Sequence, residues 1–315
     1  MNIHLPHILV LASVLSGFHN PVIAQEKGAG SRPENHQNAL SDEPKRRMSQ
    51  PVVLAPDDVP AYPAAPVGFD MLRGNIPHGK TDTVEYESKT VGAIRKMLVY
   101  TPPKYSSGIK YSVLYLLHGI GGDEFEWLRN GHPEIILDNL YAENKIASMI
   151  VVLPNGRAMK NDRAEGNVFD PEKAASFATF EKDLLNDLIP FIEAKYPVIQ
   201  HRESRALAGL SMGGGQSLNF GLGNLYTFAW VGGFSSAPNT KAPVILIPNP
   251  TETAQKLKLL WISCGNEDGL IIFSQRLHQY CKENKVPHIW HVEQGVHDFK
   301  VWKSDLYYFS QLLFR

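Results

Sequence analysis

A serine lies between two glycines in the segment Gly209-Leu210-Ser211-Met212-Gly213. It follows an apolar run and precedes a run of small residues able to begin a helix, which is the context of a nucleophile elbow. The chain doubles back at such a strand-to-helix turn, so only residues without bulk fit on either side of the serine. The turn would also aim the first backbone N–H groups of the helix at the serine hydroxyl. We therefore predict Ser211 as a nucleophile and the Met212 N–H as an oxyanion donor.

A serine hydroxyl is a weak nucleophile at neutral pH and needs a base, usually a histidine that a carboxylate orients. Asp268 follows the apolar run 259–263, and His297 follows a predicted strand over Ile289–Glu293. We predict Asp268 as the acid and His297 as the base, with Glu267 as the alternative acid. Adjacent side chains diverge, so only one of the two carboxylates can reach His297, and the other should point to solvent.

A second oxyanion donor is expected in the glycine-rich segment Leu116-Leu117-His118-Gly119-Ile120-Gly121-Gly122. The backbone N–H of Ile120 is the candidate donor, and His118 is predicted to be a structural hydrogen-bonding residue. Trp127 lies just after this segment and either stacks on an aromatic acyl group of the substrate or packs in the core. The chain order serine, aspartate, histidine is that of α/β-hydrolases.

The elements that must position these residues alternate between strand and helix patterns. Val84–Thr90 and Ile94–Thr101 alternate as an antiparallel hairpin would. Buried strands are predicted where short apolar runs occur, at Ser112–Leu117, Met149–Leu153, Ala206–Leu210, Trp230–Phe234 and Leu259–Ser263. A 3.6-residue period predicts helices over 180–192 and, more weakly, over 273–280. We predict an α/β fold with a mostly parallel central sheet, helices on both faces and an N-terminal hairpin edge, whose sites lie at the carboxyl ends of strands.

The first 69 residues differ in composition from the rest of the chain. Residues 1–24 combine a short apolar run with a small-residue cleavage site, which predicts a signal peptide and a secreted or periplasmic protein. Residues 25–69 are first polar and then rich in proline, which predicts a disordered linker that ends in an extended segment near the domain. The catalytic domain is predicted to span 70–315. Within it, the long polar segment 155–175 follows a strand end and is predicted to be a solvated loop, with a border of the substrate cleft as the alternative.

The charge composition argues against two classes of binding partner. A formal net charge of -1 over 315 residues argues against a strongly basic face, so neither a nucleic-acid partner nor a membrane partner is expected. The two cysteines, Cys264 and Cys281, are too few for a disulfide framework. We expect two buried free thiols, with an extracytoplasmic disulfide as the alternative.

Five segments together resemble the esterase D-type α/β-hydrolases of the feruloyl and acetyl xylan esterase group, and the feruloyl esterase domains attached to bacterial xylanases in particular. These segments are Arg73–Gly79, Val99–Pro103, Leu116–Glu124, Gly209–Gly213 and Gly295–Trp302. The resemblance covers roughly residues 70–315. It implies Ser211 as nucleophile, Asp268 and His297 as its partners, and the amides of Ile120 and Met212 as the oxyanion hole.

The resemblance also implies an activity. A serine esterase of this group would release feruloyl or acetyl groups from plant polysaccharide through an acyl-enzyme on Ser211. It would need no metal and no organic cofactor, and its partner would be a small-molecule or polysaccharide-linked ester. An acyltransferase, or a thioesterase of the S-formylglutathione kind, is the alternative on the same fold. A carbohydrate-binding domain with an inactive site would be expected to lack one of the three site residues.

Overall fold

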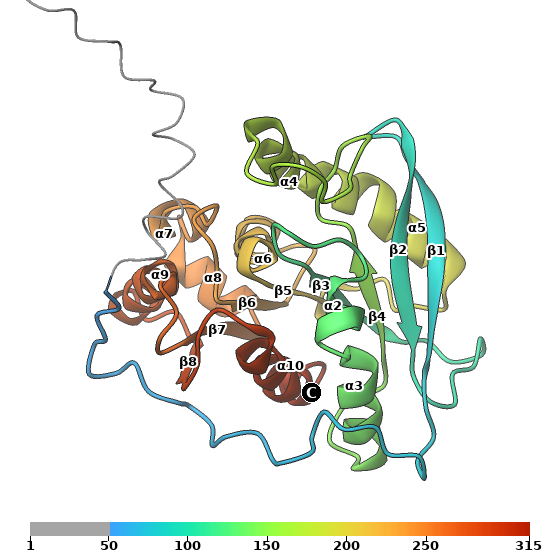
Figure 1. Ribbon diagram of the computed structural model, residues 1–315, viewed down its shortest axis with the longest axis horizontal. Coiled ribbons are helices and arrows are strands. Elements are labelled where there is room, and N and C mark those ends of the chain that lie inside the picture. The colour runs from blue at the N-terminus through green and yellow to red at the C-terminus, as the bar shows by residue number, and fades with distance from the viewer. Residues whose placement is uncertain (1–50) are drawn as a thin grey trace, which may run out of the picture.

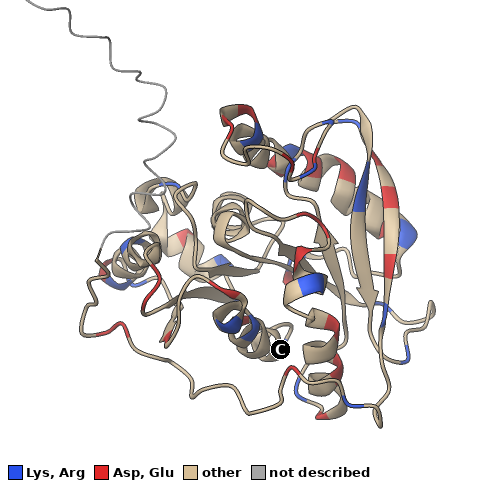
Figure 2. Ribbon diagram, in the orientation of Figure 1, with Lys and Arg blue, Asp and Glu red and all other residues tan. Residues whose placement is uncertain are grey.

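The structure, a computed structural model, describes residues 51–315 (Figure 1). The predicted signal peptide and the first part of the predicted linker lie outside the described residues. Within residues 51–315, every helix is too short or too polar to cross a membrane. Acidic and basic residues are interspersed over the helices and strands in the view of Figure 2.

The centre of the molecule is an eight-stranded sheet with the strand order β1-β2-β4-β3-β5-β6-β7-β8. The strands β1 and β2 pair antiparallel with each other, β2 pairs antiparallel with β4, and the remaining pairs are parallel. Their bounds are β1 Lys80–Ser88, β2 Ala93–Thr101, β3 Ser112–Leu117, β4 Met149–Pro154, β5 Arg205–Leu210, β6 Trp230–Phe234, β7 Leu259–Gly265 and β8 Ile289–Glu293. The sheet and its hairpin edge are those predicted, with small differences at the strand ends.

Helices cover both faces because residues of the central strands are apolar on both sides. In β3, Val113, Tyr115 and Leu117 belong to one core, whereas Leu114 and Leu116 belong to the other. The first core is closed by α4 (Pro171–Asp183), η1 (Leu184–Leu188), α5 (Ile189–Lys195), α6 (Ser211–Gly223), α7 (Pro243–Leu246) and α9 (Ile271–Glu283). The second core is closed by α2 (Glu126–Asn130), α3 (Pro133–Ala142) and α10 (Phe299–Leu312). Two short elements, η2 (Arg202–Ser204) and α8 (Pro250–Lys256), precede β5 and β7.

The predicted helix over 180–192 belongs to a longer helical segment that includes a π-helical turn. Helix α4 leads directly into η1, and η1 leads directly into α5. The π turn inserts one extra residue per turn, which shifts the apolar face relative to the sheet. Leu184 and Leu188 stay buried in the first core on either side of this shift.

Residues 51–69, here called the N-terminal strap, form the extended segment near the domain that the prolines predict. The strap packs on the domain from α9 past β8 and α10 to the start of β1 (Figure 1). Tyr62 stacks on Trp261 and Tyr308 with ring centroids 5.7 and 4.8 Å apart. The buried Asp58 carboxylate accepts a hydrogen bond from the indole N–H of Trp290 at 3.0 Å. The strap is therefore held on the surface of the domain predicted over residues 70–315.

Both cysteines are buried free thiols, as expected. Cys264 lies in β7 and Cys281 in α9, and both belong to the first core. Burial raises the pKa of each thiol above its ordinary value. The alternative of a disulfide between them is therefore wrong.

Candidate active site

The strand β5 passes into helix α6 without an intervening residue, and Ser211 lies at the junction. Its backbone has a φ of 53°, in the left-handed region that non-glycine residues rarely adopt. A side chain at Gly209 would meet the Gly213 backbone at 2.7 Å, and one at Gly213 would meet the His118 carbonyl oxygen at 2.4 Å. The two glycines are therefore required by close backbone approach, as the sequence predicts.

Ser211, His297 and Asp268 come from three separate elements and form one chain of hydrogen bonds. The Nε2 atom of His297 lies 2.9 Å from the Ser211 Oγ. The Nδ1 atom of the same ring lies 2.7 Å from the Asp268 Oδ2. Because a carboxylate only accepts, Nδ1 carries the proton and Nε2 is free to accept the serine proton. This is the arrangement of a nucleophile, its base and an orienting acid.

Asp268, and not Glu267, faces the histidine. Asp268 is buried, and its Oδ1 also accepts a hydrogen bond from the Leu270 N–H at 2.8 Å. Burial alone would raise the pKa of this carboxyl, but hydrogen bonds from His297 and Leu270 favour its charged form, and the net pKa lies below its ordinary value. The Glu267 side chain is exposed. The side chains of these two neighbours therefore diverge as predicted.

The two predicted oxyanion donors come from different elements next to the serine. Met212 is the residue after Ser211 in α6, and the Ile120 loop follows β3. A side chain at Gly119 would come within 3.5 Å of the Ser211 Cβ, so this loop lies directly against the nucleophile. Within residues 51–315, neither the Ile120 N–H nor the Met212 N–H donates to a protein acceptor. Both amides are thus available to an oxygen bound beside Ser211.

Trp127 is part of the core. Its side chain is 1% exposed and contacts the rings of Phe234 and Phe299, and its indole N–H donates to the Leu117 carbonyl at 2.9 Å. A fully packed ring has no face left for a ligand, so the predicted stacking role of Trp127 is wrong and the core alternative holds. Trp302 is also buried, and its ring meets the edge of His297 at a centroid distance of 4.9 Å.

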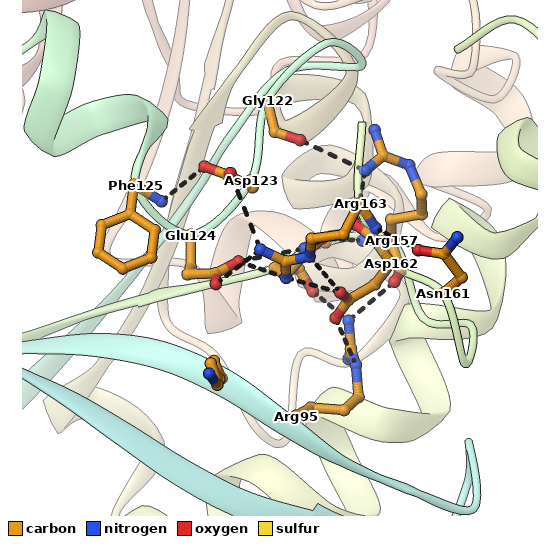
Figure 3. Close-up of polar contacts among 12 residues, drawn as sticks. Arg95, Gly122, Asp123, Glu124, Phe125, Arg157, Asn161, Asp162 and Arg163 are labelled. Atoms are coloured by element: carbon orange, nitrogen blue, oxygen red, sulfur yellow. Dashed lines mark hydrogen bonds and ion pairs between the residues drawn. The ribbon is translucent and has the colours of Figure 1, made fainter. Parts of the chain in front are cut away.

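The segment after β4 is only in part the solvated loop that its polarity predicts, since residues 165–167 and 169–172 are exposed but its first residues are not. Residues 155–158 are buried, and the Arg157 guanidinium donates to the Ile120 carbonyl at 2.5 Å and to the Asp162 carbonyl at 2.8 Å. Figure 3 shows this group beside the ion pairs of Arg163, which contacts Glu124 through both of its terminal nitrogens at 3.0 Å. The sequence does not predict these contacts. The position of the segment at the carboxyl end of a buried strand is the signal behind the alternative that it borders the site.

A second ion pair lies beneath this loop. Arg95 in β2 is buried, pairs with Asp183 at the end of α4 and donates to the Asn155 and Arg157 carbonyls at 2.7 and 2.8 Å. Because these donors belong to the edge hairpin, they join the hairpin to the loop that supports the site. A buried guanidinium needs such partners to offset its desolvation.

Comparisons with known proteins agree with this geometry. A family model described as "Putative esterase" matches residues 88–310. An endo-1,4-beta-xylanase/feruloyl esterase of Xylanibacter ruminicola is 30% identical over 265 residues, which cover 80% of this chain and 34% of that protein. An acetyl esterase of Caldicellulosiruptor saccharolyticus is 24% identical over 227 residues, which cover 61% of this chain and 79% of that protein. The chain thus spans about a third of the length of the xylanase/feruloyl esterase that it matches.

Solved structures give the same result for the fold. A ferulic acid esterase from Anaeromyces mucronatus in complex with ferulic acid superposes with a TM-score of 0.71 at 27% identity, covering 79% of this chain and 96% of that one. An S-formylglutathione hydrolase from Staphylococcus aureus superposes with a TM-score of 0.58 at 21% identity, covering 75% of this chain and 97% of that one. At that identity the second likeness concerns the fold alone.

Proposed function

The chain belongs to the esterase family, and from this premise we propose that it hydrolyses carboxylic esters through an acyl-enzyme formed on Ser211. The observation that carries the proposal is the hydrogen-bonded chain from Ser211 through His297 to Asp268, with distances of 2.9 and 2.7 Å. These two hydrogen bonds fix the tautomer of His297 that a general base requires. The three residues lie at the carboxyl ends of strands, where folds of this class place their sites.

In the first half of the reaction, the Ser211 Oγ attacks the ester carbonyl carbon and its proton passes to the His297 Nε2. The carbonyl oxygen becomes an oxyanion that accepts hydrogen bonds from the Ile120 and Met212 N–H groups. The bond from the carbon to the alcohol oxygen then breaks, and the leaving oxygen takes the proton from Nε2. Asp268 stays ionised throughout and stabilises the imidazolium that forms in between.

In the second half, a water molecule replaces the alcohol. His297 Nε2 accepts a proton from this water as its oxygen attacks the acyl carbon, and the same two N–H groups hold the second oxyanion. The bond between the acyl carbon and Ser211 Oγ then breaks, and Oγ recovers the proton from Nε2. The products are the free carboxylic acid and the unchanged enzyme.

We propose feruloyl or acetyl esters of plant polysaccharide as the substrates. The support is the names of the relatives, which include a xylanase/feruloyl esterase, an acetyl esterase and a ferulic acid esterase solved with ferulic acid. Such a substrate lies outside the cell, which agrees with the signal peptide predicted over residues 1–24. Secretion or export to the periplasm is accordingly part of the proposal.

The test is a hydrolysis assay of the purified chain with methyl ferulate, acetylated xylan, 4-nitrophenyl acetate and S-formylglutathione side by side. We expect kcat/KM to be highest for methyl ferulate or acetylated xylan, and the Ser211→Ala variant to be the control for background hydrolysis. A clear preference for S-formylglutathione would replace the substrate proposal with the thioesterase alternative. No hydrolysis of any of the four would contradict the esterase proposal itself.

A further inference from the structure

We propose that His118 is a positioning residue that orients the peptide group whose N–H forms one half of the oxyanion hole. The inference rests on the proposed function, because it assigns a role within that site. His118 is the last residue before the Ile120 loop, and it is buried. None of its hydrogen bonds reaches Ser211, His297 or Asp268. Any effect of His118 on the reaction therefore passes through the backbone of the Ile120 loop.

The peptide group between Gly119 and Ile120 is planar and trans, so its C=O and N–H point in opposite directions. Holding the Gly119 oxygen therefore fixes the direction of the Ile120 N–H. The Nδ1 atom of His118 lies 2.6 Å from this oxygen. The Gly122 N–H donates to the same oxygen at 3.1 Å. Both contacts turn the Ile120 N–H toward the side of the loop opposite the histidine.

The tautomer of His118 follows from its partners. A carbonyl oxygen only accepts, so the Nδ1 atom facing Gly119 carries a proton. The Gly156 N–H donates to the Nε2 atom at 2.8 Å, so Nε2 carries a lone pair. Nε2 also lies 3.1 Å from the Asn155 Oδ1, but the backbone N–H can only donate and decides the assignment. Burial lowers the pKa of His118, which favours the same neutral ring.

The neighbouring peptide groups of the loop are held separately. The Gly119 N–H donates to the Glu126 Oε2 at 2.7 Å, and the Ile120 carbonyl accepts from Arg157 at 2.5 Å. With both neighbours held, the Gly119–Ile120 peptide depends on His118 and the Gly122 N–H for its own rotation. His118 is the only side chain in the described chain that donates to the Gly119 oxygen.

Two substitutions of His118 test the hydrogen bonds of its two ring nitrogens separately. His118→Asn places an amide N–H near the position of Nδ1 and so keeps the donor to Gly119. His118→Gln places an amide oxygen near Nε2 and so keeps the acceptor for Gly156, but it leaves the Gly119 oxygen without its side-chain donor. The two variants are close in size and polarity, so each is the control for the other. Both are compared with the wild-type chain by circular dichroism and melting temperature.

We expect His118→Gln to lower kcat on 4-nitrophenyl acetate by about 10²-fold with little change in KM, since the loss of one oxyanion donor costs about 10² to 10³ in kcat. We expect His118→Asn to retain kcat within about tenfold. Trifluoroacetophenone forms an adduct with serine that carries an oxyanion. Its affinity, measured by fluorine NMR, should therefore be lowered more by His118→Gln than by His118→Asn. Equal losses in both variants, or none in either, would overturn the proposal.

The same experiment separates this inference from the proposed function. An inactive wild-type chain would contradict the esterase proposal, while trifluoroacetophenone binding would still report on the oxyanion hole. If neither variant folds, nitrogen NMR of the histidine-labelled wild-type chain decides the question. A proton on Nδ1 of His118 supports the proposal, and a proton on Nε2 overturns it.

Discussion

The Ser211 hydroxyl is the group on which the proposed reaction depends, and its removal is the simplest test at the scale of single residues. We expect Ser211→Ala to lower kcat on any ester by about 10³-fold or more, with the residual rate coming from the oxyanion hole and binding. The measurement is steady-state hydrolysis of 4-nitrophenyl acetate, with the melting temperature as a check on folding. A variant that kept more than about a tenth of the wild-type rate would contradict the assignment of Ser211.

The two neighbouring carboxylates allow a matched comparison. Asp268→Asn keeps the size of the side chain but favours the wrong tautomer of His297, so we expect kcat to fall by about 10³ to 10⁴-fold at neutral pH. Glu267→Gln alters an exposed side chain, and we expect less than about a tenfold loss. Parallel kcat measurements on the two variants check this, and a reversed order would make Glu267 the acid.

The local sequence is enough to predict residues whose role depends on backbone turns. Gly209 and Gly213 mark the turn at Ser211, and short loops after strands hold Asp268 and His297. The environment of Trp127 and Arg157 could not be predicted in this way. Trp127 is buried by Phe234 and Phe299, and Arg157 by the Ile120 loop, which are all distant in the sequence. A side chain's exposure depends on such partners, and one sequence does not reveal them.

At the scale of elements, the N-terminal strap is held by Asp58. Its carboxylate accepts from the Trp290 indole at 3.0 Å, from the Gln275 amide at 2.6 Å and from the Ala55 N–H at 2.7 Å. Asp58→Ala leaves the buried Trp290 donor unpaired, and we expect the free energy of unfolding to fall by about 2 kcal/mol. Urea unfolding measures this. Val67→Ala on the same strap is the control, because that side chain is fully exposed and should change stability little.

A second contact of the strap gives it a pH dependence. Hydrogen bonds from Lys282 and His278 lower the pKa of Asp57 from 3.8 to about 2. A lowered pKa in the folded state means that the contact stabilises the fold above pH 4 and that this contribution is lost as the pH falls toward 2. We therefore expect Asp57→Asn to be less stable than wild type at pH 6 and equal to it near pH 2. Thermal unfolding across this range checks the prediction, and a constant difference would contradict it.

The strands could be predicted because each is a short apolar run with a sharp end. The prolines of the strap predict its extended form, but they do not predict its anchors, which are single residues such as Asp58, Tyr62 and Phe69. Such anchors produce no period of 2 or 3.6 along the sequence. The contacts between an extended segment and distant side chains are therefore what sequence patterns do not predict.

At the scale of the whole molecule, the predicted sheet and its helices on both faces are confirmed, and the two cores explain why. Residues at alternate positions of β3 serve opposite cores, so the whole run must be apolar, and this is the signal that the sequence carries. The secreted or periplasmic location stays a prediction, since residues 1–24 lie outside the described chain.

The reactivity of the two buried thiols can report where the folded structure opens. Cys264 lies in β7, between β6 and the edge strand β8, and Cys281 lies in helix α9. Both thiols are buried, and burial raises the pKa of each. A thiol reagent such as iodoacetamide can react only when the surrounding structure opens, and it reacts with the thiolate. We expect Cys281 to be alkylated faster than Cys264 in dilute urea, because a helix that covers the sheet can detach while β7 stays paired with β6 and β8. Mass spectrometry of the two cysteine-containing peptides over time measures the two alkylation rates. The Cys281 rate reports the detachment of α9, and the Cys264 rate reports the unfolding of the sheet that carries Ser211. Equal rates would show that helix and sheet open together.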